Sequence, residues 1–169
     1  MKILNSIKRK LVVFLVNKIF VGTRPYFFEI KRKLLISIGY QIGKGTRIVG
    51  PFESYSKIVI GRDCFIGKNF KVNGNGSVVI GDCCDIAPEV TFQTGSHEIG
   101  AGNRRAGKGY NCSQKVGNGT WIGGRSTICN NVSIGNGCVI AGCACVVHDI
   151  PDNTLAGGIP AKVIRRLEV

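Results

Sequence analysis

Residues 116–146 read VGNGTWIGGRSTICNNVSIGNGCVIAGCACV, and every sixth position in this stretch is aliphatic. The same frame extends upstream, and its members are Ile80, Ile86, Phe92, Val116, Ile122, Ile128, Ile134, Ile140 and Val146. A second frame contains Ile42, Ile48, Ile60, Ile66 and Val72. A glycine or alanine often follows the aliphatic residue, and a small or β-branched residue stands four positions after it.

A period of six excludes an α-helix and a lone amphipathic strand, whose periods are about 3.6 and 2 residues. Six residues with two inward positions describe a short strand plus a corner, and three such units close one turn of a parallel β-helix. About fifteen hexads predict about five turns. We therefore expect an all-β solenoid over residues 41–150, an N-terminal arm over residues 1–40, and a C-terminal tail over residues 151–169 that ends in a short helix.

The repeat is interrupted twice. The spacing between Val72 and Ile80 is eight, which indicates a two-residue insertion in the segment NGNGSVV. Residues 98–115, EIGAGNRRAGKGYNCSQK, lack the aliphatic positions, and the frame then resumes undisturbed. Long loops on rigid scaffolds tend to carry function, so we expect a functional excursion over residues 98–115.

The net charge of +13 over 169 residues is concentrated in the arm. Residues 1–50 contain eleven Lys and Arg and a single acid, Glu29. Two basic amphipathic helices are expected here, over residues 2–20 and 26–38. They either cap the open end of the solenoid and pack on a neighbour, or also contact an anionic membrane surface. The basic residues considered for that contact are Lys8, Arg9, Lys10, Lys31, Arg32 and Lys33.

The arm has neither the length nor the composition for two other roles. Its uninterrupted apolar run, residues 11–16, is far shorter than the ~20 residues of a membrane-spanning helix. No basic-aromatic module accompanies the charge, so nucleic-acid binding is not expected. We expect a cytoplasmic protein that associates with the inner face of the membrane if the arm binds lipid.

The eight cysteines form no CxxC pair. Cys84 and Cys138 occupy the small inward position of the repeat, where a free cysteine behaves as a compact hydrophobe. This pattern favours reduced, structural cysteines in an intracellular protein, with no metal site and no disulfide.

His97 is the candidate catalytic residue. It closes the last hexad before the excursion, which predicts a ring at the corner where a mobile loop leaves the solenoid. An imidazole whose ordinary pKa is near neutrality is suited to general base catalysis.

The segment Thr94–His97 (TGSH), the loop after it and residues 116–167 resemble the hexapeptide-repeat acyltransferases, with the galactoside and maltose O-acetyltransferases and their polysaccharide-modifying relatives as the nearest branch. The resemblance covers roughly residues 58–167. It implies a left-handed parallel β-helix, a homotrimer, and acetyl-CoA in a groove between adjacent subunits.

The resemblance also implies roles for individual residues. His97 would deprotonate the acceptor, and Trp121 would flank the pantetheine arm of acetyl-CoA. Backbone groups in the two small-residue corners would bond the pantetheine amides, and basic residues of the tail would meet the adenosine 3′-phosphate. The cofactor-binding residues so implied are Trp121, Gly123, Gly124, Ala141, Gly142, Lys162 and Arg165.

Three positions depart from the family pattern. His148 stands where relatives often carry a lysine, and is either a cofactor-side contact or a surface residue. Asn73 and Asn75, in the segment ahead of the histidine, either bind the acceptor or only form a turn.

The expected function is transfer of an acetyl group from acetyl-CoA to a hydroxyl of a sugar, in bacterial surface polysaccharide or lipopolysaccharide biosynthesis. N-acetylation of an amino sugar or a xenobiotic is an alternative within the same class, and a non-catalytic scaffold is an alternative outside it. A metal-dependent carbonic anhydrase on the same scaffold needs three histidine ligands, and this chain has two histidines.

Overall fold

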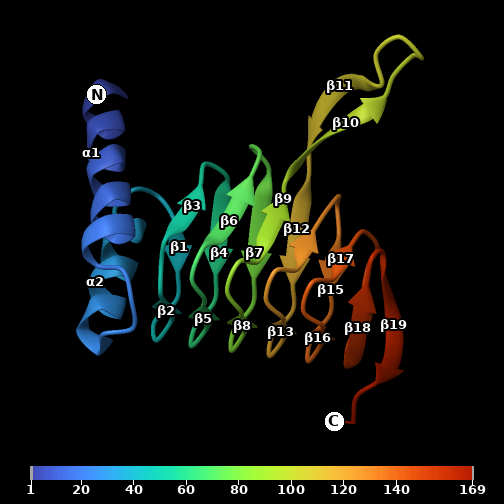
Figure 1. Cartoon of the computed structure of the whole chain (residues 1–169). Coiled ribbons are helices and arrows are strands. Elements are labelled where there is room, and N and C mark those ends of the chain that lie inside the picture. Colours follow the sequence, from blue (N-terminus) through green and yellow to red (C-terminus); the bar gives the residue numbers. More distant parts are fainter. Residues whose placement is uncertain (1, 169) are drawn as a thin grey trace.

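The computed structural model describes residues 2–168, with side chains from Leu4 onward, and shows a three-sided solenoid capped by helices at its N-terminal end (Figure 1). Sheet A contains β1 (Gln41–Ile42), β4 (Lys57–Ile60), β7 (Ser77–Ile80), β12 (Ser113–Val116) and β15 (Ser133–Ile134). Sheet B contains β2 (Arg47–Ile48), β5 (Phe65–Ile66), β8 (Asp85–Ile86), β13 (Trp121–Ile122), β16 (Val139–Ile140), β18 (Thr154–Gly158) and β19 (Ala161–Arg166). Sheet C contains β3 (Phe52–Ser54), β6 (Phe70–Asn73), β9 (Thr91–Gln93), β14 (Thr127–Ile128) and β17 (Cys145–Val146).

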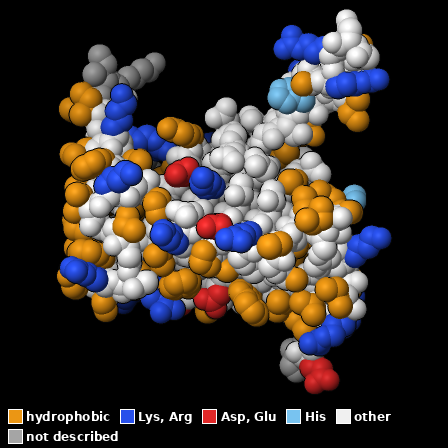
Figure 2. Space-filling view, in the orientation of Figure 1, with side chains coloured by type: hydrophobic (Ala, Val, Ile, Leu, Met, Phe, Trp, Pro, Cys, Tyr) orange, Lys and Arg blue, Asp and Glu red, His pale blue; other side chains and the backbone are white. Residues whose placement is uncertain are grey.

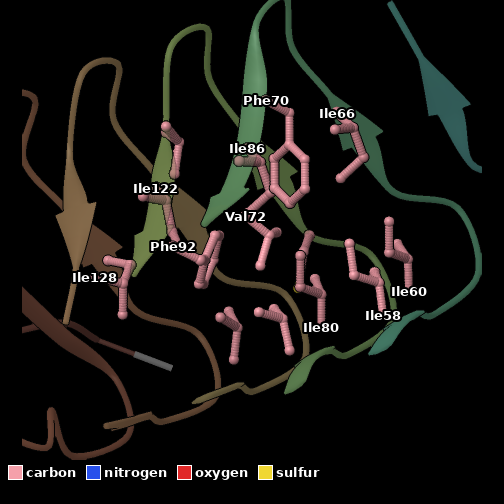
Figure 3. Close-up of a cluster of buried hydrophobic side chains, with 14 of the residues drawn as sticks. Ile58, Ile60, Ile66, Phe70, Val72, Ile80, Ile86, Phe92, Ile122 and Ile128 are labelled. Atoms are coloured by element: carbon pink, nitrogen blue, oxygen red, sulfur yellow. The ribbon is translucent and has the colours of Figure 1, made fainter. Parts of the chain in front are cut away.

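Successive turns stack in register, so that equivalent residues of the repeat lie side by side. Ile122 pairs with Ile86 in the preceding turn and with Ile140 in the following one, and all three are fully buried. The aliphatic frames therefore line a continuous core along the solenoid axis (Figure 3). This confirms the β-helix that the six-residue period predicts. The solenoid makes about six turns instead of five, because β18 adds one more strand to sheet B.

Three aromatic rings pack in a row inside the core along sheet C. Phe52 pairs with Phe70 in the next turn of sheet C, and Phe92 lies one turn further on, where it pairs with Val72. The ring centroids of Phe52 and Phe70 are 5.2 Å apart, and those of Phe70 and Phe92 are 5.7 Å apart.

The inward cysteines are structural, as expected. Cys84 and Cys138 are buried, and their Sγ atoms donate to the carbonyl oxygens of Gly117 (3.0 Å) and Pro151 (3.1 Å). Each thiol thus donates a hydrogen bond to a backbone carbonyl at a corner of the solenoid, where the sheets provide no donor. All eight cysteines lie in the described part of the chain and are free thiols.

The expected C-terminal helix is wrong. The tail forms a hairpin in which β18 pairs in parallel with β16, and β19 pairs antiparallel with β18. Gly158, at a φ of 101°, and Pro160 make the turn. A helix would leave the last edge of sheet B unpaired, whereas β19 covers it, and the β-branched pair Val163–Ile164 favours a strand.

The arm forms two helices, as expected, and covers the open end of the solenoid. α1 (Lys2–Phe14) continues into the π-helical segment η1 (Leu15–Ile19), and α2 (Pro25–Ile36) packs on β1 and β2. Val12, Val16 and Leu35 are buried and belong to the same hydrophobic cluster as the solenoid core. The arm is therefore a structural cap.

The charge pattern of the sequence predicts Lys31 on the surface, and this prediction is wrong. Lys31 is fully buried, and its ammonium group donates to the carbonyl oxygens of Gly22 (2.8 Å) and Val49 (2.9 Å) and lies over the ring of Phe28. Burial lowers the pKa of Lys31 to about 8. The Lys31 side chain thus links α2 to the start of the solenoid through hydrogen bonds.

Candidate active site

The excursion is an antiparallel hairpin made of β10 (Gly95–Ile99) and β11 (Ala106–Asn111), and it projects from the solenoid (Figure 1). The expected range of 98–115 is wrong at both ends, since the chain leaves the solenoid at Gly95 and β12 rejoins sheet A at Ser113. Backbone pairing with β7 does not require aliphatic side chains, so Ser113–Lys115 lie in the sheet although the repeat pattern is lost there.

His97 lies on this hairpin, and not at a corner of the solenoid. It is exposed and stands opposite Gly109 on the partner strand. A Cβ at Gly109 would lie 3.6 Å from His97 Nε2, an ordinary contact distance, so the ring lies directly beside this residue. Figure 2 shows the hairpin standing clear of the rest of the molecule. The hairpin therefore presents an accessible imidazole away from the wall of the solenoid.

A buried hydrogen-bond network fixes the base of the hairpin. The hydroxyl of Thr94, which is fully buried, donates to the carbonyl of Asn73 (2.9 Å) and accepts from the backbone N–H of Gly76 (3.2 Å). Ser56, in the turn before, donates to the carbonyl of Gly74 (2.7 Å). Three turns of the solenoid are thus joined next to the residue where the hairpin begins.

The same network positions the two candidate acceptor-binding residues. Asn73 and Asn75 are exposed, and between them Gly74 has a φ of 100°. A Cβ at Gly74 would lie 2.6 Å from the backbone nitrogen of Gly95, so this turn packs directly against the start of the hairpin. Asn73 and Asn75 thus lie at the foot of the structure that carries His97.

Gln114 secures the other strand of the hairpin base. It is buried, and its Nε2 donates to the carbonyls of Gln93 (2.9 Å), Ile128 (3.0 Å) and Asn130 (3.0 Å). Among the described side chains, its Oε1 is the one buried polar atom without a partner. Sequence reasoning missed both Gln114 and Ser56. Gln114 could have been found from the sequence, because it stands two residues before the inward Val116, and side chains two residues apart on a strand point to the same face. A polar residue at such an inward position indicates a buried hydrogen bond.

The residues expected to bind acetyl-CoA gather on a different face. On sheet B, Trp121 pairs with Val139, Val139 with Leu155, and Leu155 with Arg165, so these four residues form one row across the strands. Three strand spacings put Trp121 about 14 Å from Arg165. Trp121 is 54 % exposed, which leaves its indole face open beside the row.

The corner between sheets B and C carries two stacked backbone amides. A Cβ at Gly142 would lie 3.3 Å from the carbonyl oxygen of Gly124, so the two residues are neighbours in successive turns. Among the described backbone groups, neither of their N–H groups has an acceptor. By contrast, Gly123 and Ala141 already donate to the carbonyls of Ile140 and Ala156, both at 2.8 Å, so their N–H groups are not available to a ligand.

The basic residues of the tail flank the same corner. Lys162 and Arg165 are both exposed on β19, and Lys162 pairs with Gly157. A Cβ at Gly157 would contact Ala141, so Lys162 lies close to the glycine corner. An exposed ion pair between Arg125 and Glu89 (2.8 Å) joins two turns beside Gly124, and the pairing raises the pKa of Arg125.

Within one chain, His97 and the candidate acceptor-binding residues lie apart from the residues expected to bind acetyl-CoA. His97, Asn73 and Asn75 belong to the corner between sheets C and A, whereas Gly124 and Gly142 belong to the corner between sheets B and C. The strands of sheet C that separate these corners are two to four residues long, or about 7–13 Å. His148, which is exposed, follows β17 and therefore lies on the histidine side, away from the other expected cofactor residues.

The described residues, 2–168, contain no group of three His, Cys, Asp or Glu side chains arranged to hold a metal ion. Within the same range, none of the helices combines the length and the apolar character that crossing a membrane requires.

The chain matches no family model, but its relatives are clear. It is 32 % identical over 150 residues to the galactoside O-acetyltransferase of Escherichia coli K12, covering 88 % of this chain and 74 % of that protein. A hexapeptide-repeat acetyltransferase from Vibrio cholerae, solved with acetyl-CoA, superposes with a TM-score of 0.83 at 26 % identity and covers 99 % of this chain and 89 % of that one. A maltose O-acetyltransferase from Clostridium difficile 630 superposes with a TM-score of 0.67 at 29 % identity, over 98 % of this chain and 87 % of that one.

A parallel β-helix with a projecting histidine hairpin and a glycine corner thus shares its sequence and its architecture with acetyltransferases. The chain belongs to the hexapeptide-repeat acyltransferase family, in the group that contains the galactoside and maltose O-acetyltransferases.

Proposed function

We propose that the protein transfers the acetyl group of acetyl-CoA to a hydroxyl group of a sugar, with His97 as the general base. The observation that carries this proposal is the position of His97, whose exposed imidazole is held on a hairpin anchored by buried hydrogen bonds. A scaffold without activity does not need an accessible base on a fixed support. The E. coli and C. difficile relatives are named for sugar acetylation, which supports the sugar as acceptor.

The chemistry requires one proton transfer and one acyl transfer. A nitrogen of the His97 imidazole takes the proton of the acceptor hydroxyl while its oxygen attacks the thioester carbonyl. The new C–O bond forms, the C–S bond breaks, and the leaving thiolate takes up a proton. The products are the acetylated sugar and free coenzyme A.

The face that carries Trp121 fits the shape of acetyl-CoA. The unpaired N–H groups of Gly124 and Gly142 could donate to the amide carbonyls of the pantetheine arm, and the missing side chains allow close approach. The exposed indole of Trp121 offers an apolar wall beside that arm. Lys162 and Arg165 supply positive charge for the phosphate groups of the nucleotide.

We also propose a homotrimer in which the hairpin of one subunit reaches the acetyl-CoA face of the next. The base and the glycine corner lie at opposite ends of sheet C in one chain, so a second copy can complete the site. Ile99, near the tip-side end of β10, is 88 % exposed, which favours its burial against a neighbour.

The acceptor itself would bind at the foot of the hairpin, where the amide side chains of Asn73 and Asn75 are exposed. Amide groups can donate to and accept from sugar hydroxyls. We propose a sugar of a bacterial surface polysaccharide or lipopolysaccharide, acetylated in the cytoplasm, where the free thiols of this chain would stay reduced.

The test is a thiol-release assay with acetyl-CoA against a panel of hexoses, disaccharides, nucleotide-linked sugars and amino sugars. Release of coenzyme A that depends on a sugar lacking an amino group, with the product identified by mass spectrometry as an O-acetyl ester, supports the proposal. Release only with amino sugars would make the protein an N-acetyltransferase. Binding of acetyl-CoA with no turnover on any acceptor would leave the scaffold interpretation standing.

A further inference from the structure

The outer face of α1 carries a row of exposed apolar side chains that the solenoid does not use. Leu4, Ile7, Leu11 and Phe14 are 71, 58, 57 and 54 % exposed. Their spacing of three and four residues places them on one stripe of the helix. The opposite side of the same helical arm is buried through Val12 and Val16. The stripe therefore faces away from the protein.

Lysines flank this apolar stripe on both sides. At 100° per residue, Lys8 and Lys10 lie about 80° to either side of its centre line. Both are exposed, although Lys8 also donates to the carbonyl of Ser37 (2.7 Å). Figure 2 shows hydrophobic side chains along the capped end of the molecule with Lys and Arg between them. An apolar stripe bordered by lysines is the pattern of a helix that lies in a membrane interface.

The structure reassigns the other basic residues of the arm. Arg9 turns inward and donates to the Tyr40 hydroxyl (2.6 Å) and the carbonyl of Ser54 (2.7 Å). Lys31 is buried, as described above, and Arg32 donates to Glu29 and to the carbonyl of Ile42. Of the six basic residues considered from the sequence, Lys8, Lys10 and Lys33 are exposed, and Lys33 pairs weakly with Glu29 (3.7 Å).

The positive charge around the apolar stripe indicates which kind of surface it can bind. Glu29 is the single acid of residues 1–50, and Arg32 and Lys33 already pair with it. Two copies meeting through this stripe would bring like-charged lysines together, whereas an anionic surface would meet them with opposite charge. An anionic lipid bilayer can bury the apolar stripe and also attract the lysines beside it.

We propose that α1 lies flat in the headgroup region of an anionic membrane, with Ile7 and Leu11 inserted and Lys8 and Lys10 at the level of the lipid phosphates. A helix of 13 residues is too short to span, but its apolar side can enter the interface. Docking through the cap leaves the solenoid and the hairpin outside the bilayer (Figure 1).

The experiment is flotation of the full-length protein with vesicles of phosphatidylcholine alone and of phosphatidylcholine with phosphatidylglycerol. Binding is expected only with the anionic vesicles, and added salt should weaken it. Lys8→Glu/Lys10→Glu should lower the partition coefficient by at least about 25-fold, or about fivefold for each lysine. Ile7→Ser/Leu11→Ser should lower it at least about tenfold.

Lys44→Glu/Lys68→Glu is the matched control, because it makes the same charge change at exposed residues of the solenoid. It should retain most of the binding. Circular dichroism and light scattering verify the fold and the assembly of each variant, and Lys10→Glu alone avoids the contact of Lys8 with Ser37.

Three results would overturn the proposal: equal flotation with neutral and anionic vesicles, loss of binding in the control that matches the loss in the α1 variants, or unchanged binding of Ile7→Ser/Leu11→Ser. A shift to smaller assemblies in that last variant would instead identify the stripe as a contact between copies.

Discussion

The hydroxyl oxygens of Thr94 and Ser56 lie 3.1 Å apart in a buried corner, although 38 residues separate them in the sequence. Between them they satisfy backbone groups of the turn that contains Asn73. Thr94 is also the last residue before the hairpin, and its carbonyl accepts from the N–H of Cys112, which joins β11 to β12 (2.8 Å). The two exposed amides and the catalytic candidate are thus parts of one hydrogen-bonded unit.

Thr94→Val should weaken this unit without changing side-chain volume. It leaves the N–H of Gly76 without its acceptor, a loss of about 1–3 kcal/mol. We expect a lower Tm and a several-fold lower kcat, with the KM for acetyl-CoA unchanged because the glycine corner lies elsewhere. Thr94→Ser keeps the hydroxyl and should restore kcat. A Thr94→Val enzyme with the wild-type kcat would show that the network does not position His97.

His97→Ala should lower turnover by about 10²–10⁴-fold, the usual contribution of a general base. The side chain is exposed, so the Tm and the binding of acetyl-CoA should not change. Glu98→Ala is the neighbouring control, because it removes an exposed charge from the same strand. Steady-state kinetics with both variants check the assignment, which fails if both variants lose the same activity or if neither loses any.

Gly123→Ala and Gly142→Ala should separate stability from binding. A Cβ at Gly123 would lie 2.5 Å from the backbone nitrogen of Gly142, so this variant should lower the Tm. A Cβ at Gly142 has its nearest neighbour, the carbonyl oxygen of Gly124, at 3.3 Å, so a small backbone shift accommodates it and the Tm should fall much less than in Gly123→Ala. The added methyl group would crowd the amide edge, and we expect about a tenfold weaker Kd for acetyl-CoA. Thermal shift with and without acetyl-CoA measures both effects.

Ile99→Arg should disrupt the trimer if the hairpin packs on a neighbour. Its side chain is 88 % exposed in one chain, so the change should not unfold the subunit. Light scattering is expected to show a trimer for the wild-type protein and smaller species for the variant, with reduced activity. A wild-type monomer that turns over acetyl-CoA would refute the shared site.

Lys31 should make stability depend on pH above neutrality. Burial lowers its pKa from 10.5 to about 8, so between these values the unfolded chain holds more protons than the folded one. Stability therefore rises with pH across this window, by at most about 1.4 kcal/mol per pH unit. Urea unfolding of the wild type and of Lys31→Met, at pH 7.5 and 9.5, isolates the contribution of Lys31 to the free energy of unfolding. A difference that is the same at both pH values would contradict the prediction.

The solenoid could be predicted because its rule is local. Ile122 and Ile140 point inward since a hexad buries two of its side chains at fixed positions, and every turn repeats that requirement. Outward positions are equally regular, which is why Trp121 could be expected on the surface. The same rule does not predict the tail, because β19 forms only where β18 offers an unpaired edge.

The sequence by itself determined the repeat, the two arm helices and the identity of a lone histidine beside the break in the period. Only the tertiary structure decided where the hairpin begins, because Thr94 finds its partners in Ser56 and Asn73, in other turns. It also decided which lysines of the arm are free: Lys31 meets carbonyl groups 9 and 18 residues away and is buried, whereas Lys10 is left in solvent. A pattern of charge along the chain cannot distinguish these two residues, since desolvation depends on what folding brings beside each one.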